Sequence, residues 1–176
     1  MAHLRPDVSA TDQIQGDVNA PVTLVEYGDY ECPHCGAAYP MIKQVQKKMG
    51  KKLRFVFRNF PLSEAHPHAL NAAVAAEAAG RQGKFWEMHD IIYENQSQLE
   101  LDDLLRYAAK IGIDTEKFDS DFEDEKLLSK VKSDFNSGVR SGVNGTPSFY
   151  ITGEKYEGEY EGEAIVHALN KVLQRN

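Results

Sequence analysis

The spacing of apolar residues along the first third of the chain predicts a strand, a helix and a second strand. Residues 21–28 (PVTLVEYG) are a short apolar run, which is typical of a strand buried on both faces. From Pro33, apolar residues recur at helical spacing until Gly50, and residues 53–60 (LRFVFRNF) then alternate. This order predicts a β-α-β unit, whose two parallel strands need a right-handed crossover.

The last part of the chain has a second β pattern. Residues 147–151 and 155–160 have the composition of two strands around a turn at 152–154, and the apolar residues that follow share one helical stripe. We therefore predict two strands and a closing helix.

The middle of the chain, residues 63–141, shows only helical patterns, including an alanine-rich run that ends at Gly80. A helical block between two β-containing parts predicts an α/β fold with an inserted helical subdomain. The expected division is 1–62 and 142–176 for the sheet-bearing domain and 63–141 for the insertion.

Composition and charge limit the kinds of partner that we expect the chain to bind. The net charge is −7, which argues against general binding to nucleic acid or to anionic membranes. The sequence has no apolar run of about 18 residues, so we expect no membrane-embedded segment. Residues 1–20 lack the apolar core of a secretory signal peptide. As the sequence stands we expect a cytoplasmic protein, or a periplasmic or secreted one if this is a processed form.

Both cysteines of the chain fall in one motif, ECPHCG at residues 31–36. Proline suits the first helical turn, so Pro33 makes Cys32 the N-cap of the predicted helix. A thiolate at Cys32 is stabilised there by unpaired backbone N–H groups and the helix dipole, and a protonated His34 adds a nearby cation. We expect Cys32 to be exposed and to attack, and Cys35, one turn further in, to be buried and to resolve.

The two cysteines have two other interpretations. A zinc site needs two more ligands, and His66 and His68 in AHPHA are the obvious candidates, although a proline separates them. Inert buried thiols are disfavoured because a strand-to-helix junction lies at an exposed edge of a parallel sheet. CXXC beside a β-α-β pattern favours a redox pair, and we expect His66, His68 and His89 to be surface or hydrogen-bonded core histidines.

Three features together resemble one family. They are CPHC at a helix start, GTPSFY opening the third strand, and the helical insertion. On these residues the chain resembles the DsbA-like thiol-disulfide oxidoreductases of the thioredoxin superfamily. The resemblance implies a thioredoxin fold in which Pro147 is cis and packs against the redox pair. It also implies that the backbone of Thr146 pairs with substrate peptide as an added strand.

The resemblance extends to the remaining site residues. Glu26 stands in the buried run TLVEYG, where a lone carboxyl is costly unless it is partnered or protonated. The family has an acid at this position that is implicated in proton transfer with the inner cysteine. The catalytic residues that the resemblance implies are Cys32, Cys35, His34, Pro33 and Glu26. It implies no metal and no organic cofactor, because the cysteine pair itself carries the electrons.

The resemblance gives only part of the answer on the direction of the redox reaction and on the partners. The PH dipeptide resembles that of oxidases, which implies protein thiols as substrates and a re-oxidising membrane partner. Thr146 differs from the valine common in such oxidases, which puts the substrate range in doubt. Two alternatives stay open: a cytosolic reductase linked to thioredoxin or glutathione, and a non-enzymatic peptide-binding redox sensor. The 21 residues before the first predicted strand leave no room for a dimerisation domain, so we expect a monomer.

Overall fold

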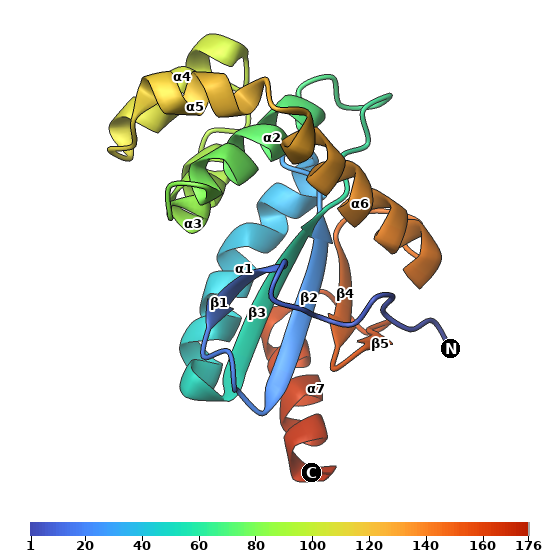
Figure 1. Ribbon diagram of the computed structural model, residues 1–176. Helices are drawn as coiled ribbons and strands as arrows, with labels where there is room; N and C mark the ends of the chain where they lie inside the picture. The colour runs from blue at the N-terminus through green and yellow to red at the C-terminus, as the bar shows by residue number, and fades with distance from the viewer. Residues whose placement is uncertain (176) are drawn as a thin grey trace.

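The computed structural model describes residues 1–175, which form a five-stranded sheet in the order β1-β3-β2-β4-β5 (Figure 1). Strands β2 and β3 are parallel, and every other neighbouring pair is antiparallel. The strands are β1 Gln13–Gly16, β2 Val22–Gly28, β3 Leu53–Asn59, β4 Ser148–Ile151 and β5 Glu154–Lys155.

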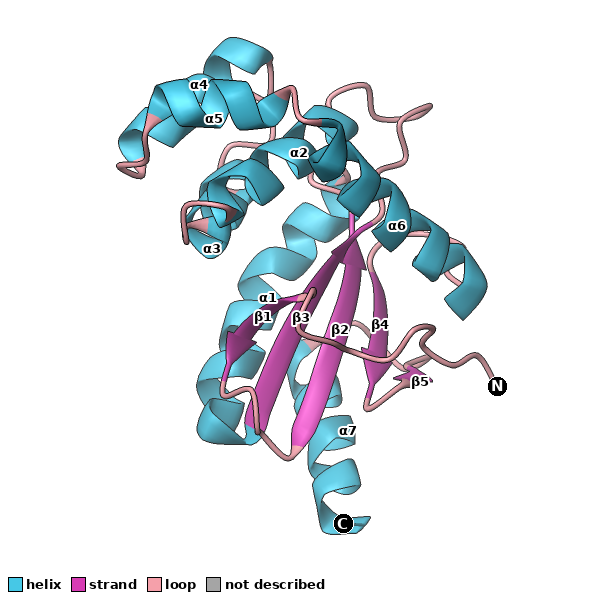
Figure 2. Ribbon diagram, viewed as in Figure 1, coloured by secondary structure: helices cyan, strands magenta, loops and turns pink. Residues whose placement is uncertain are grey.

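The central strand β2 is buried along its whole length, as the apolar run predicts. Helices α1 (Pro33–Met49) and α7 (Gly162–Arg175) cover the face of the sheet that is turned away from the viewer in Figure 2. The N-terminal segment crosses the near face, where Leu4 packs with Tyr27 and Phe60 in a second, smaller apolar cluster. The predicted β-α-β unit is confirmed, and its helix begins at Pro33 as expected.

Five helices separate β3 from β4, which confirms the predicted helical insertion. Helices α2 to α5 lie beyond the upper end of the sheet in Figure 1, and α6 runs back along its near face. The division at residues 62 and 142 stays a prediction, and Asn176 lies outside the described residues. The inserted helices are α2 Ala69–Gly80, α3 Phe85–Tyr93, α4 Leu101–Lys110, α5 Thr115–Phe122 and α6 Glu125–Ser141.

The expected start of the sheet was wrong by one strand. Residues 13–16 form β1, which pairs antiparallel with β3 at the sheet edge, before the first strand that the pattern predicted. The segment QIQG has a single apolar residue, too few to establish a strand pattern, so only its pairing with β3 makes it a strand.

The second strand of the C-terminal hairpin was also overestimated. β5 ends at Lys155 instead of continuing to residue 160. Beyond it the chain turns on itself, because the Tyr156 hydroxyl donates to the Glu159 carbonyl at 2.7 Å and the rings of Tyr156 and Tyr160 stack. These local contacts replace strand pairing at the sheet edge.

Candidate active site

The two cysteines lie at the junction between β2 and α1, which a tight turn at residues 29–32 connects. Cys32 is the N-cap of α1, with extended backbone angles (φ −70°, ψ 125°), and Pro33 occupies the first turn. The sequence predicted this arrangement from the position of Pro33 alone. It sets the Cys32 thiol beside the unpaired N–H groups of the helix start.

The structure corrects the expected exposure of Cys32. Cys32 is only 5% exposed, and Cys35 is fully buried. Cys32 is the more exposed of the two, as expected, but it is not open to solvent. The cover comes from the loop before β4, because the Cys32 Sγ lies 3.6 Å from the Thr146 carbonyl oxygen and donates to it. Cys35 Sγ accepts from the Asp29 N–H at 3.5 Å.

The surroundings shift the two thiol pKa values in opposite directions. The Cys35 thiol, as a hydrogen-bond donor, is the largest cause that lowers the pKa of Cys32 to about 5, and burial opposes it. The Thr146 side chain and the backbone N–H groups of Cys35 and His34 lower the pKa of Cys32 further. Burial is the main cause that raises the pKa of Cys35. One motif thus contains a stabilised thiolate and a stabilised thiol.

The Thr146–Pro147 peptide bond is cis, as expected, and the Thr146 carbonyl oxygen faces the Cys32 sulfur. Pro147 is buried, and the Thr146 hydroxyl is buried without a hydrogen-bond partner among the described residues. A groove of about 630 Å³ runs from His34 along α1 to the loop before α7. Its lining is His34, Ala37, Ala38, Pro40, Met41, Gln44, Thr146, Pro147, Tyr160, Glu161 and Gly162.

Glu26 lies on β2 and is 3% exposed. Burial alone raises the pKa of Glu26 to about 8, so its carboxyl keeps a proton near neutral pH. The charge that Glu26 carries when it is ionised is also among the causes that raise the pKa of Cys35. Glu26 borders a small cavity of about 10 Å³ together with His89 and Tyr93, a space about the size of one water molecule.

Sequence reasoning missed Asp29, which organises the turn before Cys32. Asp29 is 1% exposed, and its Oδ1 accepts from the N–H groups of Glu31 at 2.8 Å and Cys32 at 3.2 Å. An aspartate that bonds the amides two and three residues onward is a common turn-forming arrangement. Its position three residues before CXXC was the available signal.

Gln96 is the second residue that the sequence did not indicate. Its Nε2 donates to the carbonyl oxygens of Tyr30 and Cys32, both at 2.9 Å. Gly36 is needed for this contact, because a Cβ at that position would overlap the Gln96 side-chain amide. Nothing in the sequence around Gln96 marks this role, which depends on the packing of the α3–α4 connection against the turn.

The three histidines of the insertion all contact the turn. His66 Nδ1 lies 2.8 Å from Asp29 Oδ2, His68 Nδ1 lies 2.7 Å from Glu31 Oε2, and His89 Nδ1 lies 3.0 Å from the Tyr30 hydroxyl. They are hydrogen-bonded, as expected, but their partners are the residues immediately before Cys32. Within residues 1–175, no group of three or more His, Cys, Asp or Glu side chains is placed to hold a metal ion.

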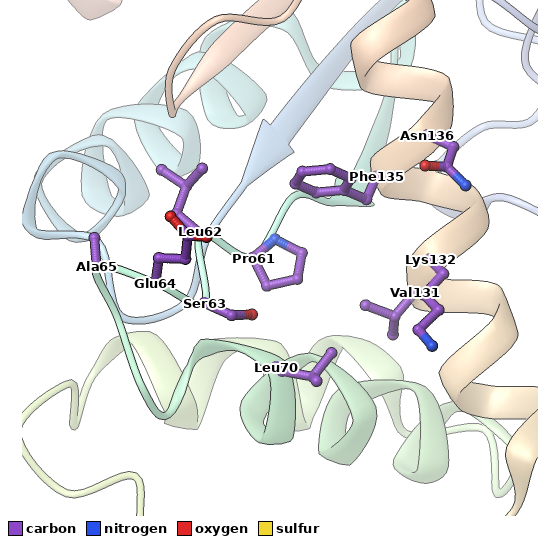
Figure 3. A pocket seen from close by; sticks show the side chains of 10 residues that line it. All are labelled: Pro61, Leu62, Ser63, Glu64, Ala65, Leu70, Val131, Lys132, Phe135 and Asn136. Atoms are coloured by element: carbon purple, nitrogen blue, oxygen red, sulfur yellow. The ribbon is translucent and has the colours of Figure 1, made fainter.

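A second hollow, of about 700 Å³, lies between the loop after β3 and helix α6. Figure 3 shows Leu62 and Ala65 on the loop, with Val131 and Phe135 opposite them on α6. None of the predicted site residues lines this hollow. Its loop wall is nevertheless joined to the active-site turn, because the Leu62 N–H donates to Asp29 Oδ2 at 2.9 Å.

Comparison with known proteins identifies the family. A thioredoxin family model matches residues 8–171, nearly the whole chain. The chain belongs to the thioredoxin family. The sheet with its inserted helices confirms the expected thioredoxin-like fold, and solved DsbA structures have the same fold.

Solved structures agree with this thioredoxin-like fold. A thioredoxin-like oxidoreductase from Silicibacter pomeroyi DSS-3 is 26% identical with a TM-score of 0.85, and the match covers 94% of each chain. Alpha-DsbA1 from Wolbachia pipientis is 21% identical with a TM-score of 0.84, covering 96% of this chain and 94% of that one.

The curated relatives are much longer proteins. One from Mycobacterium sp. (strain KMS), named Na(+)/H(+) antiporter NhaA 1, is 42% identical over 168 residues, which are 94% of this chain. The chain spans only 27% of that relative's length. In the described part of this thioredoxin-family chain, no helix is long and apolar enough to cross a membrane.

Proposed function

We propose that this chain oxidises pairs of protein thiols through the Cys32–Cys35 disulfide. The observation that carries the proposal is the placement of Cys32. Its sulfur lies at the start of α1, beside the Cys35 donor and at the Thr146 loop, where its thiolate is stabilised. A stabilised Cys32 thiolate is a good leaving group, and it favours the reduced protein and hence oxidation of the substrate.

The reaction consists of two exchanges. A substrate thiolate attacks Cys32 Sγ, the bond to Cys35 breaks, and Cys35 leaves as a thiolate that takes up a proton. The second substrate thiolate then attacks the substrate sulfur of the mixed disulfide, and Cys32 leaves as a thiolate. The substrate is oxidised by two electrons, which remain on the cysteine pair. Glu26, whose pKa is raised to about 8 near Cys35, is the proposed proton donor.

Substrate is proposed to bind as an extended peptide along the loop before β4. β5 pairs only with Tyr150 and Ile151, so it does not cover the edge of the sheet at Thr146 and Ser148. Main-chain pairing at Thr146 would carry the substrate cysteine past Cys32. The groove between His34 and Tyr160 would then take the neighbouring side chains.

The experiment measures disulfide formation in a reduced dithiol peptide by the oxidised protein. We expect turnover by the wild type and none by Cys32→Ser or Cys35→Ser, because neither variant can hold the disulfide. Mixed instead with the oxidised peptide, Cys35→Ser should accumulate a mixed disulfide, because Cys32 attacks the peptide disulfide and no Cys35 thiol is left to resolve the product. Undiminished turnover by Cys32→Ser would refute catalysis and leave the redox-sensor alternative. Equilibration with glutathione tests the direction: a potential near that of thioredoxin would favour the reductase alternative.

An oxidase needs an oxidising compartment and a partner that restores its disulfide. We therefore propose that the chain works outside the cytoplasm, as a monomer, with a membrane-bound re-oxidant. A thioredoxin- or glutathione-linked reducing system would replace that partner in the reductase alternative. Fractionation combined with trapping of the redox state of Cys32 in cells tests this proposal, and a fully reduced pair in the cytoplasm would contradict it.

A further inference from the structure

The loop after β3, at residues 61–68, meets the active-site turn at two carboxylates, and the fully buried one belongs to Asp29. Asp29 Oδ1 accepts from two amides of the turn, one of which belongs to Cys32. Asp29 Oδ2 accepts from the Leu62 N–H at 2.9 Å and lies 2.8 Å from His66 Nδ1. The carboxylate therefore connects the insertion to the residue whose sulfur reacts.

The position of Asp29 creates an electrostatic problem for the nucleophile. A negative charge this close to Cys32 disfavours the thiolate, because two like charges in a poorly solvated site repel each other. The Asp29 side chain is fully buried, so water screens its charge little, and His66 is the ionisable side chain bonded to it. A proton on His66 places a cation directly on the carboxylate.

We propose that His66 is a positioning residue whose imidazolium pairs with Asp29, holds the turn before Cys32, and offsets the carboxylate charge that opposes the Cys32 thiolate. The Asp29–His66 pair affects turnover only if the chain has the proposed function, and in that respect this proposal rests on it. It does not rest on the direction of the reaction, because the coupling between the two groups exists in either direction.

The ionisable groups around His66 support a charged imidazole. The hydrogen bond to Asp29 is the largest cause that raises the pKa of His66, burial opposes it, and the charges of Asp29, Cys32 and Glu31 raise it further. Glu64 and His68 are the other ionisable residues of its own loop. A charge on the Cys32 thiolate is thus among the causes that raise the pKa of His66.

His68 provides a matched control on the same loop. Its Nδ1 lies 2.7 Å from Glu31 Oε2, and its side chain is 38% exposed compared with 21% for His66. The Glu31 carboxylate accepts from His68 on both oxygens, whereas the Cys32 amide donates to Asp29. Each pair joins an imidazole to a carboxylate, but only the carboxylate of Asp29 accepts a hydrogen bond from the Cys32 amide.

The first experiment uses the unmodified protein. Coupling between two sites is reciprocal, so a thiolate at Cys32 must raise the pKa of His66 by as much as the imidazolium lowers that of Cys32. NMR titration of the imidazoles should give a pKa of His66 about one unit higher in the dithiol form than in the disulfide form. Equal values for His66 in the two forms would overturn the proposal.

The second experiment compares His66→Gln with His68→Gln by thiolate absorbance and by equilibration with glutathione. His66→Gln should raise the pKa of Cys32 by about one unit and shift the equilibrium about tenfold toward the disulfide form. His68→Gln should change neither. A purely structural role for His66 predicts lower stability with an unchanged pKa of Cys32, which would also overturn the proposal. A wild-type potential near thioredoxin would contradict only the proposed oxidase direction.

Discussion

At the scale of single residues, the two cysteines differ because of what surrounds each sulfur. Cys32 lies at the start of a helix, where the Cys35 thiol, the Thr146 side chain and two backbone N–H groups stabilise a negative charge. Cys35 is fully buried one turn further in, where a charge is poorly solvated. The same side chain therefore acts as a thiolate in one position and as a thiol in the other.

Thr146 offers a residue-scale prediction. Replacing it with valine keeps the shape and the backbone carbonyl but removes the hydroxyl, which bonds no other group among the described residues and lowers the pKa of Cys32. We expect Thr146→Val to raise that pKa from about 5 by up to about one unit, and to make the pair more reducing. Thiolate absorbance against pH measures the effect. An unchanged midpoint would show that the hydroxyl does not reach the thiolate.

At the scale of elements, the insertion holds the turn that positions the nucleophile. Gln96 bonds two carbonyl oxygens of the turn, and Asp29 bonds both the turn and the loop after β3. Gly36, directly after CPHC, leaves the space through which Gln96 reaches these carbonyls. The helical insertion is thus part of the active-site framework, and Gly36 gives α1 the space that the Gln96 side chain occupies.

A double-mutant cycle tests the contact between Gly36 and Gln96. Alanine is a better helix former than glycine by about 1 kcal/mol, yet Gly36→Ala should lower the free energy of unfolding by about 1–3 kcal/mol because its Cβ overlaps Gln96. In a Gln96→Ala background the same substitution should be neutral or stabilising. Urea unfolding of the four proteins measures the coupling, and strictly additive effects would show that the two side chains do not compete for space.

At the scale of the whole molecule, folding keeps an ionisable acid in the centre of the sheet. Glu26 lies on the strand that is buried along its whole length, between β3 and β4. Keeping it there is unfavourable whenever the carboxyl is charged. The proposed role in proton transfer to Cys35 accounts for a residue that lowers the stability of the fold.

This cost has a defined pH window. The native pKa of Glu26 is raised from 4.5 to about 8, so its contribution to stability is complete below about 4.5 and is lost as pH rises toward 8. Relative to Glu26→Gln, the disulfide form of the wild type should lose about 5 kcal/mol of its free energy of unfolding across this window. Denaturant unfolding at several pH values measures it. A constant difference between the two proteins would contradict the raised pKa.

The sequence predicted the parts of this molecule that depend on local pattern. The burial of β2, the start of α1 at Pro33 and the N-cap position of Cys32 all follow from residues close together in the chain. It failed where an element depends on contacts that the residue pattern does not show. β1 is a strand only because β3 lies beside it, and β5 ends at Lys155 because Tyr156 forms contacts of its own.

By itself, then, the sequence determined which residues carry the chemistry, because a cysteine pair at a helix start is a local arrangement. The tertiary structure decided how that chemistry is tuned. It covers Cys32 with the Thr146 loop, and it brings Asp29 together with His66, thirty-seven positions along the chain. Hydrogen bonds and charges act over a few ångströms regardless of separation in sequence, so only the folded chain shows which of them meet at the sulfur.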